Sequence, residues 1–311
     1  MVNMSSLTIT DADIPDCSGK TVVITGGSSG IGWAAAGIFE SHGARVYILD
    51  RNPPQEELAV KRNISYCACD ITQWSSVLAA FRSIGRIDIL VANAGVSEEA
   101  DYFHDSFDEL GELVEPRYGV LDVNLRGTLN VIKIALSMMR RSQTAGSIVI
   151  TSSATAYSPE YSLPVYSASK LALIGLMRAL RASLPLDGIT INAVAPAATI
   201  TGLLPANLAA PIIAAGLPTS SPEFVALAIA YAASAQQTRA VELYGKDPKS
   251  AVDDLSPGRW NGRTILTLGD CYTELEQAIS DLRPQWFGEE NARLTRMQQV
   301  ATDFRPVHEK V

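Results

Sequence analysis

Residues 21–32 read TVVITGGSSGIG, a run of five β-branched residues followed by a glycine-rich turn and the start of a helical pattern. A short apolar, β-branched run of this kind predicts a strand. The glycines after it allow backbone N–H groups and a helix N-terminus to approach a pyrophosphate without interference from Cβ atoms. This order of strand, turn and helix predicts the first unit of a dinucleotide-binding fold.

Working outward, six further apolar runs alternate with helical patterns, which is typical of βαβ units around a parallel sheet. The predicted strands span residues 21–25, 44–49, 64–69, 87–92, 147–152, 189–194 and 263–268. The predicted helices between them span residues 30–42, 73–84, 106–140, 164–184 and 222–237. We therefore expect an α/β protein with a single Rossmann-type, doubly wound, seven-stranded parallel sheet.

This interpretation divides the chain into three parts. Residues 1–19 form an N-terminal extension, residues 20–270 a dinucleotide-binding catalytic domain, and residues 271–311 an extension with extra C-terminal helices. Segment 97–119 is rich in Asp and Glu and lacks a clear period, so we expect a solvated excursion before the long helix.

Composition narrows the classes of function. The formal net charge of -8 would repel a nucleic-acid backbone. The first 20 residues carry three Asp and no apolar run, and no stretch reaches the roughly 18 apolar residues of a spanning helix. The four cysteines form no CxxC pair. We expect a cytoplasmic protein that binds no nucleic acid, no membrane and no metal ion.

The acid at the end of the second strand indicates which dinucleotide is bound. The Asp50 carboxylate can accept hydrogen bonds from the adenosine ribose hydroxyls and would repel a ribose 2′-phosphate, which favours NAD over NADP. Arg51 supports the alternative, because a guanidinium beside Asp50 could pair with that phosphate. The predicted cofactor contacts of the turn are Gly26, Ser28, Ser29, Gly30, Ile31 and Gly32.

A tyrosine and a lysine on the helix after the fifth strand point to proton transfer. Tyr166 and Lys170 are four positions apart, so they share one helix face. A neighbouring ammonium, aided by the positive nicotinamide ring of the cofactor, favours the phenolate and is expected to lower the tyrosine pKa towards neutral pH. Ser153 follows the preceding strand at its carboxyl end, where open α/β sheets bind their ligands. Its hydroxyl can orient a substrate oxygen opposite Tyr166.

Taken together, these motifs resemble the short-chain dehydrogenase/reductase family over roughly residues 18–270. The motifs that carry the resemblance, in the family's order and usual spacing, are TGGSSGIG (25–32), Asp70, NAG (93–95), Asn124, Ser153 and YSASK (166–170). An elongated carboxyl end and the acid at position 50 are similar to NAD-linked secondary-alcohol dehydrogenases, including those like 15-hydroxyprostaglandin dehydrogenase.

The resemblance implies a role for each matching residue. Tyr166 would be the acid/base, Lys170 its pKa modifier and a ribose binder, and Ser153 the group that orients the substrate oxygen. Asn124 would hold a water that relays protons from Lys170. The residues implied to border the adenine are Asp70 and Ile71, and those implied to form the central cofactor wall are Asn93, Ala94 and Gly95.

One departure from the family pattern follows the sixth strand. The family has Pro-Gly where this chain has Pro196 and Ala197, and alanine enters positive φ less readily than glycine. The predicted contacts to the nicotinamide carboxamide, the backbone of Thr199 and the hydroxyl of Thr201, depend on this turn.

The expected substrate follows from loops 154–163 and 199–221. No charged residue occurs from position 193 to 222, and loop 199–221 is rich in Leu and Ile. Such a wall favours a mostly apolar secondary alcohol or ketone, for example a terpenoid, polyketide, steroid-like or fatty molecule. The same pattern also fits a helix packed into the core.

We expect an NAD-dependent oxidoreductase that forms a homodimer or homotetramer. The alternatives are an NADP-dependent ketoreductase and a non-catalytic dinucleotide-sensing or scaffold protein.

Overall fold

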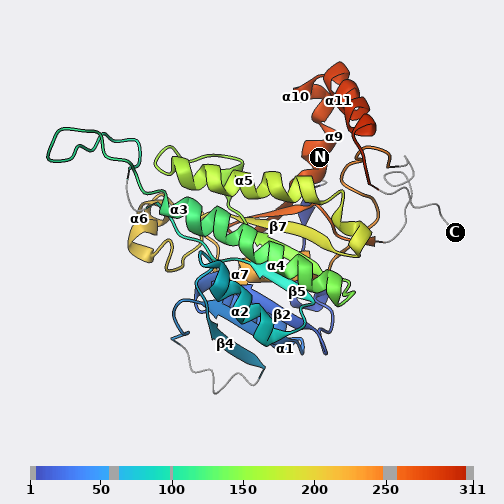
Figure 1. Ribbon diagram of the computed structural model, residues 1–311, viewed down its shortest axis with the longest axis horizontal. Coiled ribbons are helices and arrows are strands. Elements are labelled where there is room, and N and C mark those ends of the chain that lie inside the picture. The colour runs from blue at the N-terminus through green and yellow to red at the C-terminus, as the bar shows by residue number, and fades with distance from the viewer. Residues whose placement is uncertain (1–4, 56–62, 99–100, 248–257, 306–311) are drawn as a thin grey trace.

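The computed structural model describes residues 5–55, 63–98, 101–247 and 258–305, except for the side chain of Leu208. Parts of segments 1–19, 97–119 and 271–311 therefore lie outside the described residues. Within the described residues, the main sheet has nine strands, and helices cover both of its faces (Figure 1). The strand order is β4-β3-β2-β5-β6-β7-β10-β11-β1. This confirms the predicted doubly wound α/β fold.

All seven predicted strands are present and pair in parallel. They are β2 (Thr21–Thr25), β3 (Arg45–Asp50), β4 (Ile64–Ala68), β5 (Ile89–Ala92), β6 (Ser147–Thr151), β7 (Thr190–Pro196) and β10 (Thr264–Leu268). Between β2 and β5 the direction of winding reverses, which creates the crevice where doubly wound sheets bind ligands.

Two short antiparallel strands extend the sheet beyond the seven that we expected. Strand β11 (Cys271–Glu274) pairs with β10, and β1 (Ser6–Leu7) pairs with β11. The turn between β10 and β11 begins at Gly269, whose φ of +61° suits glycine. A separate two-stranded sheet joins β8 (Gln236–Gln237) and β9 (Gly258–Arg259). Strands of two to four residues are too short to show a hydrophobic period.

Alternate residues of the central parallel strands enter two separate cores. Val22 and Ile24 of β2 pack on one face against α1 (Gly30–Ser41) and α7 (Pro222–Ser234). Val23 packs on the other face, and the helices there are α2 (Trp74–Ile84), α4 (Thr128–Arg141) and α5 (Pro164–Leu180). Because both faces of the central strands are covered, those strands are mostly apolar rather than alternating.

The helix predicted over 106–140 begins only at Gly119. It comprises α3 (Gly119–Leu121), a π-helical turn η3 (Asp122–Gly127) and α4. Residues 101–118 instead form an arm, closed by a bridge between Phe107 and Leu113. The Asp108 carboxylate accepts hydrogen bonds from the N–H groups of Leu110 and Glu112, a local turn that competes with helix.

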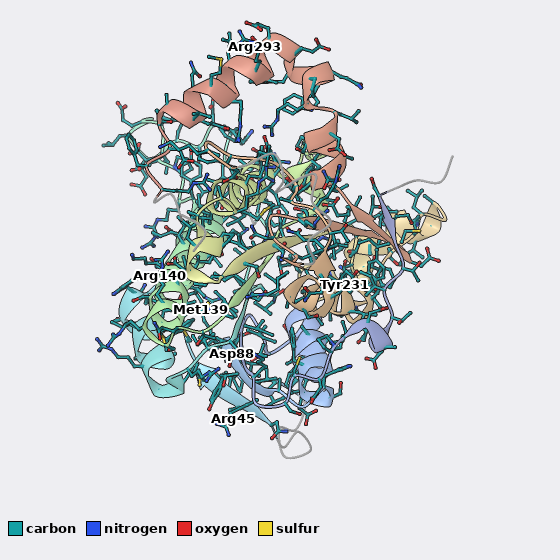
Figure 2. All side chains as sticks on the ribbon, turned by 90° about the vertical axis from the view of Figure 1, so that its right-hand side faces the viewer. Arg45, Asp88, Met139, Arg140, Tyr231 and Arg293 are labelled. Atoms are coloured by element: carbon teal, nitrogen blue, oxygen red, sulfur yellow. The ribbon has the colours of Figure 1, made fainter. Side chains whose placement is uncertain are left out.

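The remaining helices are short or lie near the carboxyl end. An unpredicted helix α6 (Ala206–Ala214) follows β7. The carboxyl-terminal helices are α9 (Glu276–Asp281), α10 (Arg283–Phe287) and α11 (Glu289–Ala301), and α10 and α11 stand off from the sheet (Figure 2). The 3-10 turns are η1 (Asp11–Asp13), η4 (Ala154–Ala156) and η5 (Leu184–Asp187). In the described part of the chain, every helix is too short or too polar to cross a bilayer.

Candidate active site

A cavity of about 850 Å³ opens at the carboxyl ends of β2, β3, β5, β6 and β7. Most of the predicted site residues line it, and they come from separate strands, loops and helices. Those lining residues are Gly26, Ser29, Gly30, Ile31, Asp50, Arg51, Asp70, Ile71, Asn93, Ala94, Gly95, Ser153, Tyr166, Lys170, Pro196, Thr199 and Thr201. Ser28, Gly32 and Asn124 lie behind this surface.

The glycine turn after β2 has no room for a side chain at Gly26 or Gly32. A Cβ at Gly26, where φ is +63°, would lie 2.8 Å from Cα of Ala94. A Cβ at Gly32 would lie 2.1 Å from the carbonyl oxygen of Gly26. The turn therefore brings the N-terminus of α1 close to the end of β2, the arrangement that accommodates a pyrophosphate.

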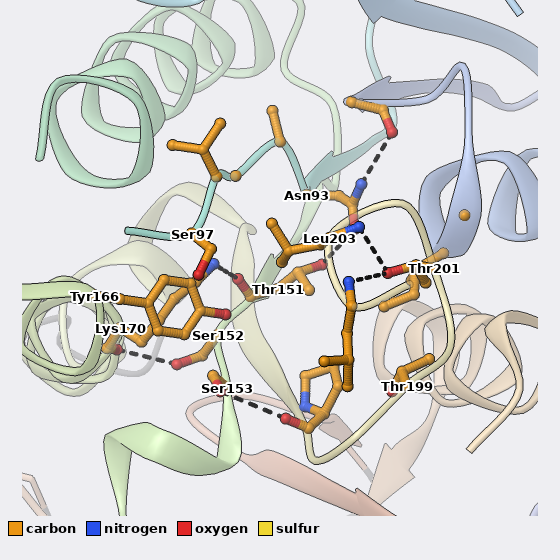
Figure 3. Close-up of a pocket in the computed structure, with 18 of the residues that line it drawn as sticks. Asn93, Ser97, Thr151, Ser152, Ser153, Tyr166, Lys170, Thr199, Thr201 and Leu203 are labelled. Carbon is orange, nitrogen blue, oxygen red and sulfur yellow. Dashed lines mark hydrogen bonds between the residues drawn. The ribbon is translucent and has the colours of Figure 1, made fainter. Parts of the chain in front are cut away.

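Asn93 joins the glycine turn to two neighbouring strands. Its Nδ2 donates to the carbonyl oxygens of Thr25 and Gly26, both at 3.1 Å, and its Oδ1 accepts from the hydroxyl of Thr151 at 3.1 Å. Figure 3 shows Asn93 and Thr201 on one side of the pocket and Tyr166, Lys170 and Ser153 on the other. Asn93, which we expected to form part of the cofactor wall, therefore also links the glycine turn to β6.

Asp50 ends β3 at the rim of the cavity. Its carboxylate accepts hydrogen bonds from the N–H groups of Ser28 and Asn52, each at 3.2 Å. The hydroxyl of Ser28 is buried and has no hydrogen-bond partner within the described residues. Arg51 is exposed and lines the same cavity, and no ion pair to its guanidinium occurs in the described ranges. These groups fit the adenosine end of a dinucleotide.

Tyr166 and Lys170 both lie in the first turns of α5 and are buried. The Nζ atom of Lys170 is 5.5 Å from the ring centroid of Tyr166 and donates a hydrogen bond to the carbonyl oxygen of Thr151 at 3.0 Å. Burial lowers the pKa of Lys170 to about 8. Lys170 therefore changes charge only slightly above neutral pH.

The expected lowering of the tyrosine pKa is not found. Burial is the larger effect and raises the pKa of Tyr166, while a hydrogen bond with the Ser153 side chain opposes the rise. The same desolvation that acts on the phenol also disfavours the lysine ammonium, whose charge was expected to stabilise the phenolate. In this structure the phenol is the favoured form at neutral pH.

Ser153 is buried, lies two residues after the end of β6 and lines the cavity. Its Oγ accepts a hydrogen bond from the N–H of Thr155 at 3.1 Å, and its hydroxyl donates a long one, 3.5 Å, to the carbonyl oxygen of Pro196. The long bond exchanges readily for a better acceptor. The serine is thus positioned by the backbone yet able to bind a substrate oxygen beside Tyr166.

Asn124 is fully buried in the π-helical turn η3. Its Oδ1 accepts from the N–H of Val96, and its Nδ2 donates to the Val96 carbonyl oxygen and to the Ser169 hydroxyl. A Cβ on Gly95 would lie 3.3 Å from both Asn124 Oδ1 and Lys170 Nζ. The side chain of Asn124 therefore fixes the loop after β5, and its water relay stays a prediction.

Comparison with known proteins agrees with this geometry. A family model described as short chain dehydrogenase matches residues 20–210. The chain belongs to this family.

Relatives of the family match almost the whole chain. It is 55% identical over 302 residues to the short-chain dehydrogenase/reductase prx4 of Penicillium rubens, covering 97% of this chain and 90% of that protein. It is 47% identical over 309 residues to the short-chain dehydrogenase/reductase ATR7 of Stachybotrys chlorohalonatus, covering 97% and 95%. The crystal structure of a 3-ketoacyl-(acyl-carrier-protein) reductase from Brucella melitensis with NADH shares the fold, with a TM-score of 0.62, 24% identity and coverage of 81% and 98%.

The residues implied to border the adenine in this short-chain dehydrogenase follow β4. Asp70 and Ile71 both line the cavity. The Asp70 carboxylate also accepts hydrogen bonds from the N–H and the hydroxyl of Thr72, at 2.9 and 2.8 Å. It therefore caps a turn and faces the cavity at once.

The turn that departs from the family pattern is unstrained. Among the described residues, Gln143 is the one non-glycine with positive φ, so Ala197 adopts an ordinary conformation. The Thr199 hydroxyl donates to the Ala197 carbonyl oxygen at 3.0 Å. The Thr201 oxygen accepts from the N–H groups of Leu203 and Leu204, which leaves its own proton free to donate.

The apolar loop 199–221 forms a wall of the cavity. Leu203, Leu204 and Ile212 line it, whereas Ile213 and Leu217 are exposed. Of the α6 side chains that the structure describes, Ala209 alone is buried. Of the two interpretations of this loop, the structure supports the covering wall over the core helix.

Three further residues at or near the site were not predicted from the sequence: Glu98, Thr155 and Glu160. Glu98 accepts a hydrogen bond from the backbone of Tyr166, and the other two line the cavity. Thr155 and Glu160 lie in loop 154–163, which was expected to face the substrate, but no pattern singled them out. Glu98 lies in segment 97–119, which we expected to be solvated.

Proposed function

We propose that the protein is an NAD(H)-dependent oxidoreductase that interconverts a secondary alcohol and a ketone on a mostly apolar small molecule. One observation carries the proposal. Ser153, Tyr166 and Lys170 converge in the cavity that also holds the glycine turn and Asp50. A protein that only sensed a dinucleotide would need the turn and the acid but no proton donor beside them.

Different residues of the chain would bind different parts of the dinucleotide. A bound nicotinamide dinucleotide would supply or accept the hydride. The glycine turn and the N-terminus of α1 would hold its pyrophosphate, and Asp50 its adenosine ribose. Lys170, within reach of Tyr166, would bind the second ribose. Pro196, Thr199 and the Thr201 hydroxyl would face the carboxamide.

Proton transfer is assigned to Tyr166. In the reductive direction its phenol donates a proton to the substrate oxygen, and in the oxidative direction its phenolate accepts one. Ser153 would donate a hydrogen bond to the same oxygen and hold it in place. Because burial raises the pKa of Tyr166, the phenol is the predominant form at neutral pH.

The preference for NAD rests on Asp50. Its carboxylate would repel a 2′-phosphate, while Arg51, free of ion pairs within the described residues, favours the NADP alternative. Fluorescence titration with NADH and NADPH separates the two. We expect tighter binding of NADH, with the preference reduced in Asp50→Ser and retained in Arg51→Ala. Tighter binding of NADPH by the unaltered protein would overturn the assignment.

The substrate class is inferred from the wall opposite the reacting groups. Leu163, Leu203, Leu204 and Ile212 present apolar surface to the cavity, which suits a terpenoid, polyketide, steroid-like or fatty ketone. The likeness to 15-hydroxyprostaglandin dehydrogenases stays a prediction, as do the cytoplasmic location and the homodimer or homotetramer.

The decisive experiment removes the phenolic hydroxyl. Tyr166→Phe should bind NADH as the unaltered protein does, yet lose at least about a hundredfold in turnover of apolar ketones, because general acid–base catalysis is worth that much. Tyr161→Phe is the matched control, since Tyr161 is 97% exposed. Substrates are found by following NADH absorbance across a set of hydrophobic ketones and secondary alcohols. Turnover by Tyr166→Phe at the rate of the unaltered protein would contradict the mechanism.

A further inference from the structure

The acidic arm, residues 101–118, carries apolar side chains that no part of the described chain covers. Phe103, Phe107, Leu110 and Leu113 are 60 to 87% exposed. The arm is closed on itself by the Phe107–Leu113 bridge and anchored at its base, where the rings of Tyr102 and Tyr118 lie 5.2 Å apart. Figure 1 shows it extending away from the sheet and helices. Exposed apolar side chains gathered on one projection mark a docking element.

Carboxylates surround these apolar side chains. The arm contains six acidic residues and one arginine. The side chains of Asp105, Glu109, Glu112 and Glu115 make no ion pair or hydrogen bond within the described residues. The arm therefore presents an apolar tip with unpaired negative charge, and its partner should be apolar and basic.

A surface of that kind lies between α2 and α4, and we name it the basic groove. It has a volume of about 550 Å³ and is lined by Trp74, Leu78, Arg82, Gly85, Lys133, Ile134, Ser137, Met138, Arg141 and Ser142. Its three cations, Arg82, Lys133 and Arg141, make no ion pair in the ranges that the structure describes. Neither α2 nor α4 contains an Asp or a Glu. The groove thus combines an apolar floor with uncompensated positive charge.

The arm of the same molecule does not fill this groove. The arm joins α3 just before α4 begins, whereas the α4 residues that line the groove extend from the middle of that helix to its carboxyl end. The 14 residues of α4 span about 21 Å. In Figure 1 the arm points away from that end of the helix. The occupant must therefore come from another molecule.

We propose that the basic groove of one protomer binds the acidic arm of a second copy of this chain. The exposed Phe and Leu side chains of the arm would cover Trp74, Leu78 and Met138, while its carboxylates would face Arg82, Lys133 and Arg141. In a two-fold symmetric dimer the exchange is reciprocal, so two arm-to-groove contacts form and no unpaired arm remains.

Charge reversal on each surface tests the proposal. The groove variant carries Arg82→Glu and Lys133→Glu, and the arm variant carries Glu109→Lys and Glu112→Lys. Sedimentation equilibrium measures self-association at low and high salt. Each variant alone should dimerise at least about tenfold more weakly than the unaltered protein, because like charges would meet in the contact. High salt should weaken the unaltered dimer.

Mixing the two variants supplies the sharpest readout. In the mixed dimer the acidic arm of the groove variant meets an unaltered basic groove, and the reversed arm meets the reversed groove. An equimolar mixture should therefore regain affinity. The variant Glu289→Lys with Glu290→Lys on α11 makes the same charge change elsewhere and should associate normally. Circular dichroism confirms that each variant is folded.

Three results would overturn the proposal. They are a monomeric unaltered protein, unchanged association of the groove and arm variants, and a mixture that associates no better than its components. A substrate KM that changes in the arm variant while the mass stays the same would assign the arm to the cavity of its own chain instead.

Discussion

The carboxylate of Glu98 accepts a hydrogen bond from the backbone N–H of Tyr166 at 2.8 Å. Tyr166 lies in the first turn of α5, where N–H groups have no acceptor within the helix, and the N-cap residue Leu163 supplies none from its side chain. A carboxylate here also complements the positive end of the helix dipole. Glu98 thereby ties the loop after β5 to the turn that carries the phenol.

Removing this contact should affect turnover more than cofactor binding. In Glu98→Ala the first turn of α5 loses its acceptor, and we expect kcat to fall about tenfold through misplacement of Tyr166, with the KM for NADH unchanged. Glu98→Gln keeps an acceptor oxygen and should recover most of the loss. Steady-state kinetics on both variants checks this. Equal rates in the alanine and glutamine variants would show that the hydrogen bond does not position the tyrosine.

Long-range contacts of this type explain what the sequence could not predict. The central parallel strands were predictable because burial on both faces makes them nearly continuous apolar runs, as in β2 and β5. The glycine turn, Asp50 and Ser153 were predictable because strand ends converge on one edge. The cap from Glu98 joins residues 68 positions apart and leaves no local pattern.

Two other differences arise from competition between local and tertiary effects. The predicted helix does not extend before Gly119, because the turn at Asp108 and Gly111, whose φ is +80°, give the chain another conformation there. The pKa of Tyr166 was predicted from its neighbour Lys170, four residues away, but burial decides its direction. Burial depends on the packing of the whole chain around α5, which spacing along one helix does not reveal.

Gly32 packs so closely against the carbonyl of Gly26 that we expect a single added methyl group to disrupt cofactor binding. In Gly32→Ala the new Cβ would lie 2.1 Å from the Gly26 carbonyl oxygen, so α1 must move off β2 and NADH binding should be lost. Gly175→Ala is the control, because nothing lies within 4 Å of its Cβ position, and it should stabilise α5 by about 0.5 to 1 kcal/mol. Fluorescence titration and urea unfolding measure both effects. Normal NADH affinity in Gly32→Ala would contradict the close approach.

The buried lysine predicts a rise in stability with pH. Lys170 has a folded pKa of about 8, below the value of 10.5 expected for the unfolded chain, so the unfolded state binds more protons in that interval. The free energy of unfolding should therefore increase by about 2 kcal/mol between about pH 7.5 and 9.5 from this group alone. Lys170→Met should lack this increment, whereas Lys20→Met, an exposed control, should retain it. Urea unfolding at both pH values decides, and identical pH profiles for the two variants would exclude a depressed lysine pKa.

A buried ion cluster joins the carboxyl-terminal helices to α5, and its loss should loosen them. Glu276 at the start of α9, with a side chain 1% exposed, accepts hydrogen bonds from Arg178 at 2.8 and 2.9 Å and from the Tyr157 hydroxyl at 2.6 Å. Glu276→Gln leaves the guanidinium without its counter-charge, and we expect a loss of about 3 kcal/mol in unfolding free energy. Glu290→Gln removes an equally close ion pair that is more than half exposed on both sides, and it should change stability by less than about 1 kcal/mol. Urea unfolding and limited proteolysis of α9 to α11 compare the two. Equal losses would mean that burial does not set the strength of this junction, since the two pairs differ chiefly in their exposure to water.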